Sequence, residues 1–580
     1  MPKQKNLVGI ILLMNKIRVG ILIIGVTLNV VGSMWASDFH TSPTWLNALY
    51  YEPTGSGYKS LAESPDFFIT PTGQLDPKGE YEASLDLVIK QDKGFKTKFP
   101  YRYKLLTTFH DIAYHPSVTL DEKIVKTVIA YPNRYMNNPA SMFGHIFLVL
   151  ETERGPLDSD ILHYVAETNG DTGLPYMAKG LSGRYRGWFY RESYYKKIKY
   201  YNYVEDRDIL YYDLKLTEDE QENLQLHHLE LQNSYFYYYF LDKNCSFFIA
   251  KLLNAVMAEQ VAIKWPYMMP SHVMNDLIAS DSLDNERRRV ASTKLFNAVF
   301  NTLNRHEKQQ VMRLLTEEID TAPTDPKVLK AFLLSSEYMI NNHSPLAATV
   351  RQNRIKAYHA LERQNDTAVR PTETPATRPT IIPSKVLEAS YNGKDRYQLE
   401  YSPIYFSEYQ HFDKLNIIDV KALSLGVATG PEAPTKYTLD LIELTNIKEY
   451  NVVLNSFSWT FKSSIAYQDE FLFNHEFMVG RAWNLFNKTL IYGLVGGTYA
   501  NYDDMSDLHL SDSQVLETLE VGTLNQLSTT LKLNLKYSYK YRNDFIITEL
   551  LYKPQKIIYG LSLTSKKDET LLGVSFRVLF

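Results

Sequence analysis

The stretch LKLNLKYSYKY, Leu531 to Tyr541, alternates strictly between two kinds of side chain. Its odd-numbered positions hold leucine or tyrosine, and its even-numbered positions hold lysine, asparagine or serine. Successive side chains of a β-strand point to opposite faces, so this period of two predicts a strand with one apolar and one polar face. SFSWTFK (456–462) and DRYQLEYS (395–402) repeat the pattern, and about twelve such segments follow Lys385, separated by turn-like stretches.

Two architectures fit these strands. A soluble sandwich would bury the apolar faces in a core, whereas an outer-membrane antiparallel β-barrel would turn them to lipid and turn the polar faces to a lumen. Lysines on the polar faces suit a wet lumen, and the many aromatic side chains suit interfacial girdles. The ending TLLGVSFRVLF places Leu572, Val574, Phe576, Val578 and Phe580 on one face, and it resembles the last strand of bacterial outer-membrane barrels. These features favour a barrel of about twelve strands over residues 385–580.

The remaining 384 residues predict several further parts, because 580 residues are too many for one core. Lysines and an arginine ahead of the apolar run Val19–Val31, followed by small residues, predict an export signal over residues 1–37; an uncleaved anchor helix is the alternative. We expect a mixed, mostly helical N-terminal domain over 38–125 and an α+β domain over 126–257. A helical region over 258–365 and a Pro/Thr-rich linker over 366–384 follow.

Cys245 is the only cysteine of the chain, so it forms no internal disulfide. It lies in YFYYYFLDKNCSFFIAKLL, after a tyrosine-rich run and at the start of an apolar pattern with helical spacing. Asn244 is a favourable N-cap residue, which places Cys245 in the first helical turn, where the helix dipole lowers a thiol pKa. The sequence therefore predicts either a nucleophilic cysteine or a small buried hydrophobe.

A cysteine nucleophile needs an imidazole beside it, and two histidines are candidates. His145 follows a polar turn in NNPASMFGHIFLVL and begins an apolar strand, where a histidine is costly unless its nitrogens are satisfied. A hydrogen-bonded core histidine is the alternative interpretation. His163 lies in ILHYVAET, on what we expect to be the next strand, and is a candidate for the group that orients His145.

These motifs resemble the Lnb N-terminal periplasmic domain family. The similarity covers roughly residues 125 to 257: NNPASMFGHIFLVL, then the acidic helix start after Leu216-Thr217, then the tyrosine-rich segment that leads to Asn244-Cys245. FFITPTGQLDPKGEYEASL (67–85) and KFPYRYKLL (98–106) resemble the segment that precedes this domain in many members, and members of this architecture also carry a C-terminal outer-membrane barrel.

The resemblance implies a papain-like (NlpC-type) periplasmic domain in permuted order, with histidine before cysteine. It implies that Cys245 is the nucleophile and His145 the general base of an acyl transfer through a thioester. The Cys245 backbone N–H, with the Asn244 side chain as a second candidate, would form the oxyanion hole. Members that gave the family its name are lipoprotein N-acyltransferases, so the implied partners are a phospholipid acyl donor, a lipoprotein acceptor, outer-membrane lipid and the barrel-insertion machinery.

Three functions stay open at this point. The first is a lipid-to-lipoprotein acyltransferase, the second a cysteine peptidase or amidase acting on peptidoglycan stem peptides, and the third a non-enzymatic barrel that binds or scaffolds. The run Tyr235–Phe240 either lines an acyl groove or packs in the core. We expect no cofactor and no metal, since a single cysteine and HLELQ after His227 and His228 lack the spacing of a zinc site. A net charge of −4 gives no reason to expect nucleic acid.

Overall fold

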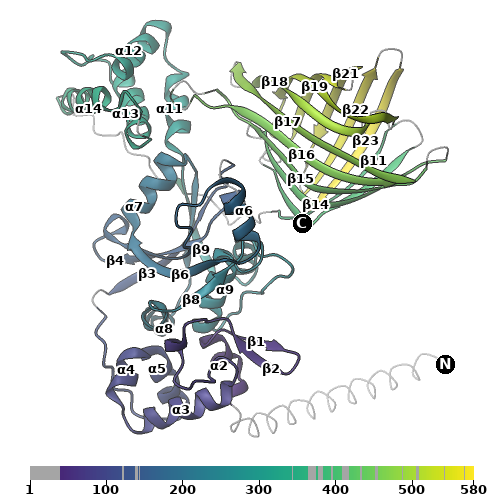
Figure 1. Cartoon of the computed structure of the whole chain (residues 1–580). Coiled ribbons are helices and arrows are strands. Elements are labelled where there is room, and N and C mark those ends of the chain that lie inside the picture. The colour runs from purple at the N-terminus through teal and green to yellow at the C-terminus, as the bar shows by residue number, and fades with distance from the viewer. Residues whose placement is uncertain are drawn as a thin grey trace, which may run out of the picture. The chain divides into compact units, whose positions relative to one another are not determined.

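The structure is a computed structural model (Figure 1) that describes residues 39–120, 123–136, 141–142, 144–342, 344–363, 374–375, 383–392, 396–407, 417–431, 434–450, 453, 455–485, 488–503, 508–540, 543–554, 556–566 and 569–580. The chain divides into two compact units. The first comprises Met1–Tyr131, Phe143–Lys197 and Tyr211–Asn285, and the second comprises Pro132–Met142, Ile198–Leu210 and Glu286–Phe580. The predicted signal peptide, residues 1–37, lies outside the described residues. Among the described helices, none has the length and apolar character needed to cross a membrane.

The N-terminal part of the first unit consists of short helices and one hairpin. Asp76 and Asp92 cap two of these helices, since their carboxylates accept hydrogen bonds from the backbone N–H groups of Gly79 and Phe95 at 2.9 and 2.7 Å. The elements are η2 (Phe39–Thr41), α2 (Pro43–Ala48), β1 (Tyr51–Thr54), β2 (Gly57–Ser60), η3 (Pro65–Phe67), α3 (Pro77–Ile89), α4 (Lys93–Lys98) and α5 (Pro100–Phe109).

A mixed sheet-and-helix region follows and carries the candidate site. Its strands β3 (Ile124–Pro132), β4 (Phe147–Thr152), β5 (Asp160–Ala166), β6 (Tyr185–Ser193) and β8 (Tyr235–Tyr238) are neighbours in that order, and β7 (Ile209–Leu214) and β9 (Leu283–Arg289) continue the sheet beyond β3. Every residue of β4 is buried, which explains the unbroken apolar run FLVL. The helices are α6 (Gly173–Leu181), α7 (Tyr194–Ile198), α8 (Glu218–Leu231), α9 (Cys245–Val256) and α10 (Pro270–Ala279), with η5 at Pro156–Asp158 and the π-helix η6 at Lys199–Val204.

Helix α9 is buried along its whole length and packs on this sheet. The ring of Phe248 lies 4.2 Å from the ring of Tyr164 on β5 and 4.7 Å from the ring of Phe236 on β8, measured between centroids. Helix α8 starts at the capping box that the sequence predicts, because Thr217 and Glu220 exchange their side-chain and backbone hydrogen bonds. The buried position of α9 fixes its first residue, Cys245, against the sheet.

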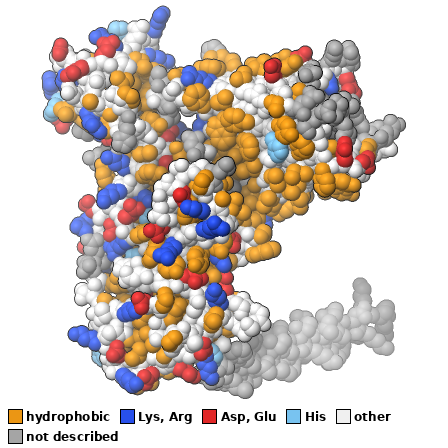
Figure 2. Space-filling model, viewed as in Figure 1, with side chains coloured by type: hydrophobic (Ala, Val, Ile, Leu, Met, Phe, Trp, Pro, Cys, Tyr) orange, Lys and Arg blue, Asp and Glu red, His pale blue; other side chains and the backbone are white. Residues whose placement is uncertain are grey.

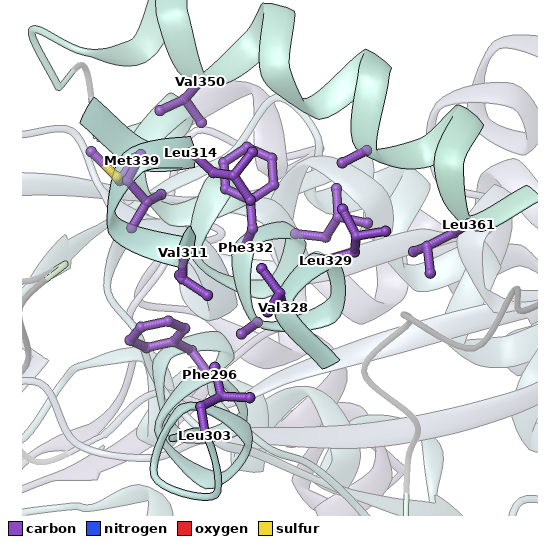
Figure 3. Close-up of a cluster of buried hydrophobic side chains, with 14 residues drawn as sticks. Phe296, Leu303, Val311, Leu314, Val328, Leu329, Phe332, Met339, Val350 and Leu361 are labelled. Carbon is purple, nitrogen blue, oxygen red and sulfur yellow. The ribbon is translucent and has the colours of Figure 1, made fainter. Parts of the chain in front are cut away.

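Four amphipathic helices of the second unit lie within the helical region predicted over 258–365, and the strand β9 also falls in that range. Their apolar sides meet in one core (Figure 3), in which Phe296, Val311, Leu329 and Phe332 are almost completely buried. The helices are α11 (Ser292–Phe300), α12 (Arg305–Thr316), α13 (Pro326–Asn341) and α14 (Ala347–Glu362). Of the predicted Pro/Thr-rich linker, the described residues include the two-residue strand β10 (Thr374–Pro375).

The C-terminal strands form a closed antiparallel barrel. The first strand, β11 (Val386–Tyr391), pairs with the last, β23 (Glu569–Leu579), and β12 (Tyr397–Ser402) pairs with β14 (Ile417–Thr429). Setting aside the short β13 (Ile404–Ser407), twelve of the thirteen described strands of this sheet close the ring. The others are β15 (Lys436–Ile447), β16 (Ser458–Gln468), β17 (Glu470–Leu485), β18 (Thr489–Asp503), β19 (Leu508–Gln526), β20 (Leu531–Lys540), β21 (Asn543–Tyr552) and β22 (Ile557–Lys566).

The closed ring of strands and the exposure of its apolar side chains together distinguish a membrane barrel from a soluble sandwich. The side chains that the alternation places on the apolar face, such as Leu535, Tyr537 and Phe576, are exposed on the outside of the barrel, whereas Lys532 and Lys540 on the polar face are buried inside. Figure 2 shows hydrophobic side chains gathered over the barrel surface. A soluble sandwich would bury these side chains, so the prediction of a membrane barrel of about twelve strands is confirmed.

Candidate functional site

Asn244 is the N-cap of α9 and holds the first turn of the helix in place. Its side-chain oxygen accepts hydrogen bonds from the backbone N–H groups of Ser246 and Phe247 at 2.9 and 3.3 Å. Its amide nitrogen donates to the carbonyl oxygens of Phe240, Leu241 and Met268, at 3.1, 3.3 and 2.7 Å respectively. The side chain of Asn244 therefore anchors the turn to two loops as well as capping the helix.

The sulfur of Cys245 is surrounded by hydrogen-bond donors. The backbone N–H groups of Ile146 and Ser246 act on it, and so do the hydroxyls of Ser246 and Tyr238; Sγ lies 3.9 Å from the Ser246 Oγ. The Tyr238 hydroxyl also interacts with the backbone N–H of Cys245 itself. A cysteine that served only as a small hydrophobe would have apolar neighbours, whereas these four donors stabilise a thiolate.

Burial of Cys245 acts against the effect of these donors on the pKa of its thiol. Only 5% of the Cys245 side chain is exposed, and burial raises the pKa of its thiol above the ordinary value in spite of the hydrogen bonds from Ser246, Ile146 and Tyr238. The lowering of the thiol pKa that the helix N-terminus predicts is therefore wrong for the folded chain at rest. Desolvation disfavours the charged thiolate more than the donors favour it, so the resting thiol is neutral.

The fold brings both candidate histidines to the same end of the sheet. His145 is directly followed by Ile146, the residue whose N–H acts on the Cys245 sulfur. The imidazole rings of His145 and His163 lie 6.4 Å apart between centroids and perpendicular to each other. His145 is thus next in sequence to a residue that acts on the Cys245 sulfur, and its ring lies near that of His163.

A carboxylate that no sequence motif singled out holds His163 in place. Its Nε2 lies 2.8 Å from Oε1 of Glu192 on β6, and the same Oε1 lies 2.8 Å from Nζ of Lys197. The hydrogen bond with His163 lowers the pKa of Glu192 to about 2, while burial lowers the pKa of His163. His163 is thus a neutral imidazole whose Nε2 is held by Glu192, while its Nδ1 is buried and has no hydrogen-bond partner among the described residues.

The tyrosine-rich run before Cys245 packs against glycines and sheet residues. The Phe240 ring occupies the space that a Cβ on Gly180 would need, and the Tyr239 ring does the same at Gly183, whose φ is +69°. Tyr238 stacks on Tyr164 with the ring planes 8° apart. Core packing therefore accounts for most of the run, and the Tyr238 hydroxyl at the cysteine is the exception.

Sequence reasoning missed Tyr238, Ser246 and Glu192. Ser246 adjoins the cysteine and could have been named from its place in the first turn of α9. Tyr238 sits among five other aromatic residues of Tyr235–Phe240 with no signal that sets it apart, and Glu192 meets His163 only because β5 and β6 pair side by side. Both residues become functional candidates through contacts that spacing along the chain does not encode.

Two family models match the first half of the chain. Residues 117–276 match the Lnb N-terminal periplasmic domain, and residues 37–109 match a domain of unknown function. The resemblance stated from the motifs is therefore confirmed, and the matched segment contains Cys245, His145 and His163. No curated protein matches this chain.

Solved structures of a porin and of an autotransporter β domain match part of the chain. A KdgM porin in complex with disordered oligogalacturonate is 10% identical over 34% of this chain and 98% of its own, with a TM-score of 0.24. The β domain of the Bordetella autotransporter BrkA is 8% identical over 34% of this chain and 97% of its own, with a TM-score of 0.20. These TM-scores are too low to support a conclusion about fold or function. The evidence for a membrane barrel is the closed ring of strands and its apolar outer face. With the periplasmic-domain match, they place the chain in the outer membrane with a periplasmic domain.

Proposed function

We propose that the chain is a periplasmic thiol acyl-transfer enzyme held at the outer membrane by its barrel. One observation carries the proposal: the sulfur of the only cysteine sits among four hydrogen-bond donors at the N-terminus of a buried helix, beside the backbone of the residue after His145. Such a site can stabilise a thiolate that forms during reaction even though the resting thiol is neutral. The match to the Lnb N-terminal periplasmic domain supports the same assignment.

The residues take distinct roles in this mechanism. His145 removes the proton from the Cys245 thiol as the sulfur attacks the carbonyl carbon of an ester or amide. The leaving alcohol or amine takes that proton from the imidazolium, the carbon–oxygen or carbon–nitrogen bond breaks, and an acyl thioester remains on Cys245. A second nucleophile, an amine or water, then attacks the thioester carbon and gives its proton to His145. The carbon–sulfur bond breaks, the acyl group leaves on the second nucleophile, and the Cys245 sulfur takes the proton back from His145.

The oxyanion of each tetrahedral intermediate needs donors that are already in place. We assign these to the backbone N–H of Cys245 and the hydroxyl of Tyr238; the N–H now interacts with the hydroxyl oxygen and exchanges that partner for the oxyanion when substrate binds. Asn244 acts as the cap that fixes this turn, because its amide nitrogen is committed to the carbonyls of Phe240, Leu241 and Met268. His163, held by Glu192, is assigned as the positioning residue for His145.

The proposed substrates follow from the family resemblance. A phospholipid would donate the acyl chain and the amino terminus of a lipoprotein would accept it, both within reach of a periplasmic domain on an outer-membrane barrel. We also propose that the domain has the permuted papain-like arrangement, with histidine before cysteine, that the family resemblance implies. An amidase acting on peptidoglycan stem peptides would use the same pair of residues, so substrate trials must separate the two.

The test is to trap the thioester. Purified full-length chain in detergent is incubated either with phosphatidylethanolamine of defined acyl length or with a disaccharide tetrapeptide, quenched in acid and weighed by intact mass spectrometry. With the lipid we expect the mass of one acyl group to be added to the chain and to be removed by neutral hydroxylamine. The added mass should be absent in Cys245→Ser and present in Ser182→Ala, a control at an exposed position. Adducts from the peptide alone would establish the amidase, and no adduct from either, with a silent amide-cleavage assay, would favour a scaffold.

A further inference from the structure

One end of the barrel lumen is filled with apolar side chains that point inward. We call the end where β11 starts and β23 stops the proximal end; the chain enters there from the periplasmic part. The inward side chains near this end touch one another and form what we call the proximal apolar cluster. Its buried members are Val386, Tyr405, Ile447, Met478, Ala482, Leu490, Tyr492, Leu494, Leu524, Leu551, Ile558 and Leu579.

These positions lie at equivalent heights on the wall. Val386 opens β11 and Leu579 ends β23, while Leu490 and Leu524 face each other across the β18–β19 pair close to the ends of both strands. Every member of the cluster exposes between 0% and 6% of its surface. Side chains that lined a water-filled channel would be accessible to water, whereas the described side chains of this cluster leave almost no accessible surface at this end of the lumen.

Charged side chains also occupy the lumen and pair with one another; most lie beyond the cluster, whereas Arg577 is level with Ile558 and Lys532 with Leu551. Arg577 Nε lies 2.9 Å from Oε1 of Glu388, Lys421 Nζ lies 3.0 Å from Oε1 of Glu400, and Lys540 Nζ lies 2.7 Å from Oε2 of Glu476. Two cavities remain among these groups, of about 460 and 330 Å³. Glu443, Lys462 and Arg577 line both cavities, whereas Met478, Tyr492 and Leu524 of the proximal apolar cluster line only the larger one. The larger cavity therefore ends on the cluster.

We propose that the barrel is a sealed membrane anchor: the proximal apolar cluster closes its lumen, and the barrel conducts neither ions nor polar solutes. Barrels of about eight strands are filled by side chains and those of 16–18 strands hold aqueous channels, so a twelve-strand barrel can be either. In this barrel, the side chains that occupy the lumen distinguish between the two cases. An ion leaving the charged region must pass buried and mostly apolar side chains, with Lys532 level with Leu551 among them, and it loses most of its hydration there. This inference concerns the barrel alone and is independent of the chemistry at Cys245.

The experiment is electrical recording of the purified full-length chain in planar lipid bilayers. We expect the natural chain to give no conductance steps. A variant with Leu490→Ala, Leu524→Ala and Leu551→Ala removes inward bulk at the proximal end and is expected to give discrete steps. The matched control changes three outward-facing leucines, Leu535→Ala, Leu561→Ala and Leu563→Ala, and is expected to stay silent. Heat-modifiable gel mobility shows whether each variant has a folded barrel.

Two outcomes would overturn the proposal. Regular conductance steps from the natural chain would show that the lumen is open. A folded inward variant that stays silent would show that the cluster is not what closes it. If the inward variant does not fold, swelling of liposomes that contain the natural chain in isotonic arabinose supplies the second readout: no swelling supports the seal, and swelling refutes it.

Discussion

Nε of Arg102 lies 3.0 Å from Oε2 of Glu230, and both side chains are completely buried although 128 residues separate them. Arg102 belongs to α5, within the match to the domain of unknown function, and Glu230 belongs to α8, within the match to the Lnb N-terminal periplasmic domain. Arg102 Nη1 also lies 3.2 Å from Oε1 of Glu80. The two matched segments therefore share a buried ionic group and form one folded unit.

Removing the cation of this group should destabilise the first unit. Arg102→Met leaves Glu80 and Glu230 buried without their positive partner, and we expect a loss of about 3–5 kcal/mol in the free energy of unfolding. The control is Arg191→Met, whose partner Asp160 lies at the surface, where such pairs contribute less than about 1 kcal/mol. Thermal unfolding of the full chain, followed at the first transition, measures both. Equal effects of the two variants would contradict a structural role for Arg102.

The thiol of Cys245 should be unreactive in the resting chain. Because burial raises its pKa, the thiolate fraction stays small at neutral pH, and the rate of alkylation by iodoacetamide should rise with pH without a plateau below pH 9. In urea the same cysteine should react at the rate of an ordinary thiol. As the chain has one cysteine, the labelling has a single source. A plateau below pH 8 in the folded chain would instead reveal a resting thiolate.

Tyr238→Phe tests the proposed oxyanion donor. The substitution keeps the ring that stacks on Tyr164 and removes only the hydroxyl, so the fold should be preserved. Loss of one such donor typically costs roughly 100–1,000-fold in kcat, and we expect a loss of that size in thioester formation with little change in KM. Tyr237→Phe, on the exposed face of the same strand, is the matched control and should retain activity. An unchanged kcat in Tyr238→Phe would remove this residue from the mechanism.

His145→Ala and His163→Gln should separate a base from its positioning residue. Loss of His145 removes the proton acceptor, and we expect roughly 100-fold slower thioester formation at pH 7, partly recovered at high pH where the thiol ionises by itself. His163→Gln keeps a hydrogen-bonding side chain opposite Glu192, so we expect a smaller loss and a shift in the pH–rate profile. Identical pH–rate profiles for the natural chain and His163→Gln would contradict a positioning role.

The first unit should lose stability in acid because of two buried histidines on α8. Burial lowers the pKa of His227 to about 3 and that of His228 to about 4, from 6.5. The unfolded chain therefore takes up protons that the folded chain refuses, and stability falls as pH decreases from 6.5 toward these values. At pH 4.5 each histidine is expected to cost roughly 2 kcal/mol. The raised pKa of buried Glu230 acts in the opposite direction and offsets part of this loss.

The double variant His227→Phe, His228→Leu checks this dependence. None of the four ring nitrogens of these histidines has a hydrogen-bond partner among the described residues, so apolar replacements leave no donor unpaired. We expect the melting temperature of the variant to fall less between pH 7 and pH 4.5 than that of the natural chain. A decrease of the same size in both would assign the acid sensitivity to other groups.

Local patterns predicted the parts of this molecule that local chemistry determines. The alternation in 531–541 predicted which side chains face lipid, and Thr217, Glu220 and Asn244 predicted the starts of α8 and α9, because caps and strand faces depend on residues only a few positions apart. Contacts between distant segments had no such signal. In the sequence, Glu230 is not distinguished from the other acidic residues of its helix, yet it is the ionic partner of Arg102. Likewise, burial of Cys245 raises the pKa of its thiol, whereas its place in the first helical turn predicted a lower pKa.

The pairing of β11 with β23 also constrains the order in which the molecule can assemble. Val386 pairs with Leu579, so the seam joins segments 193 positions apart, and the ring cannot close before the last strand is present. Residues of the first unit are synthesised earlier and can fold while the strands are still open. During that interval the outward-facing rows of leucine and tyrosine have neither lipid nor neighbouring strands to cover them. Mutations that slow closure are therefore expected to show first as aggregation of the chain.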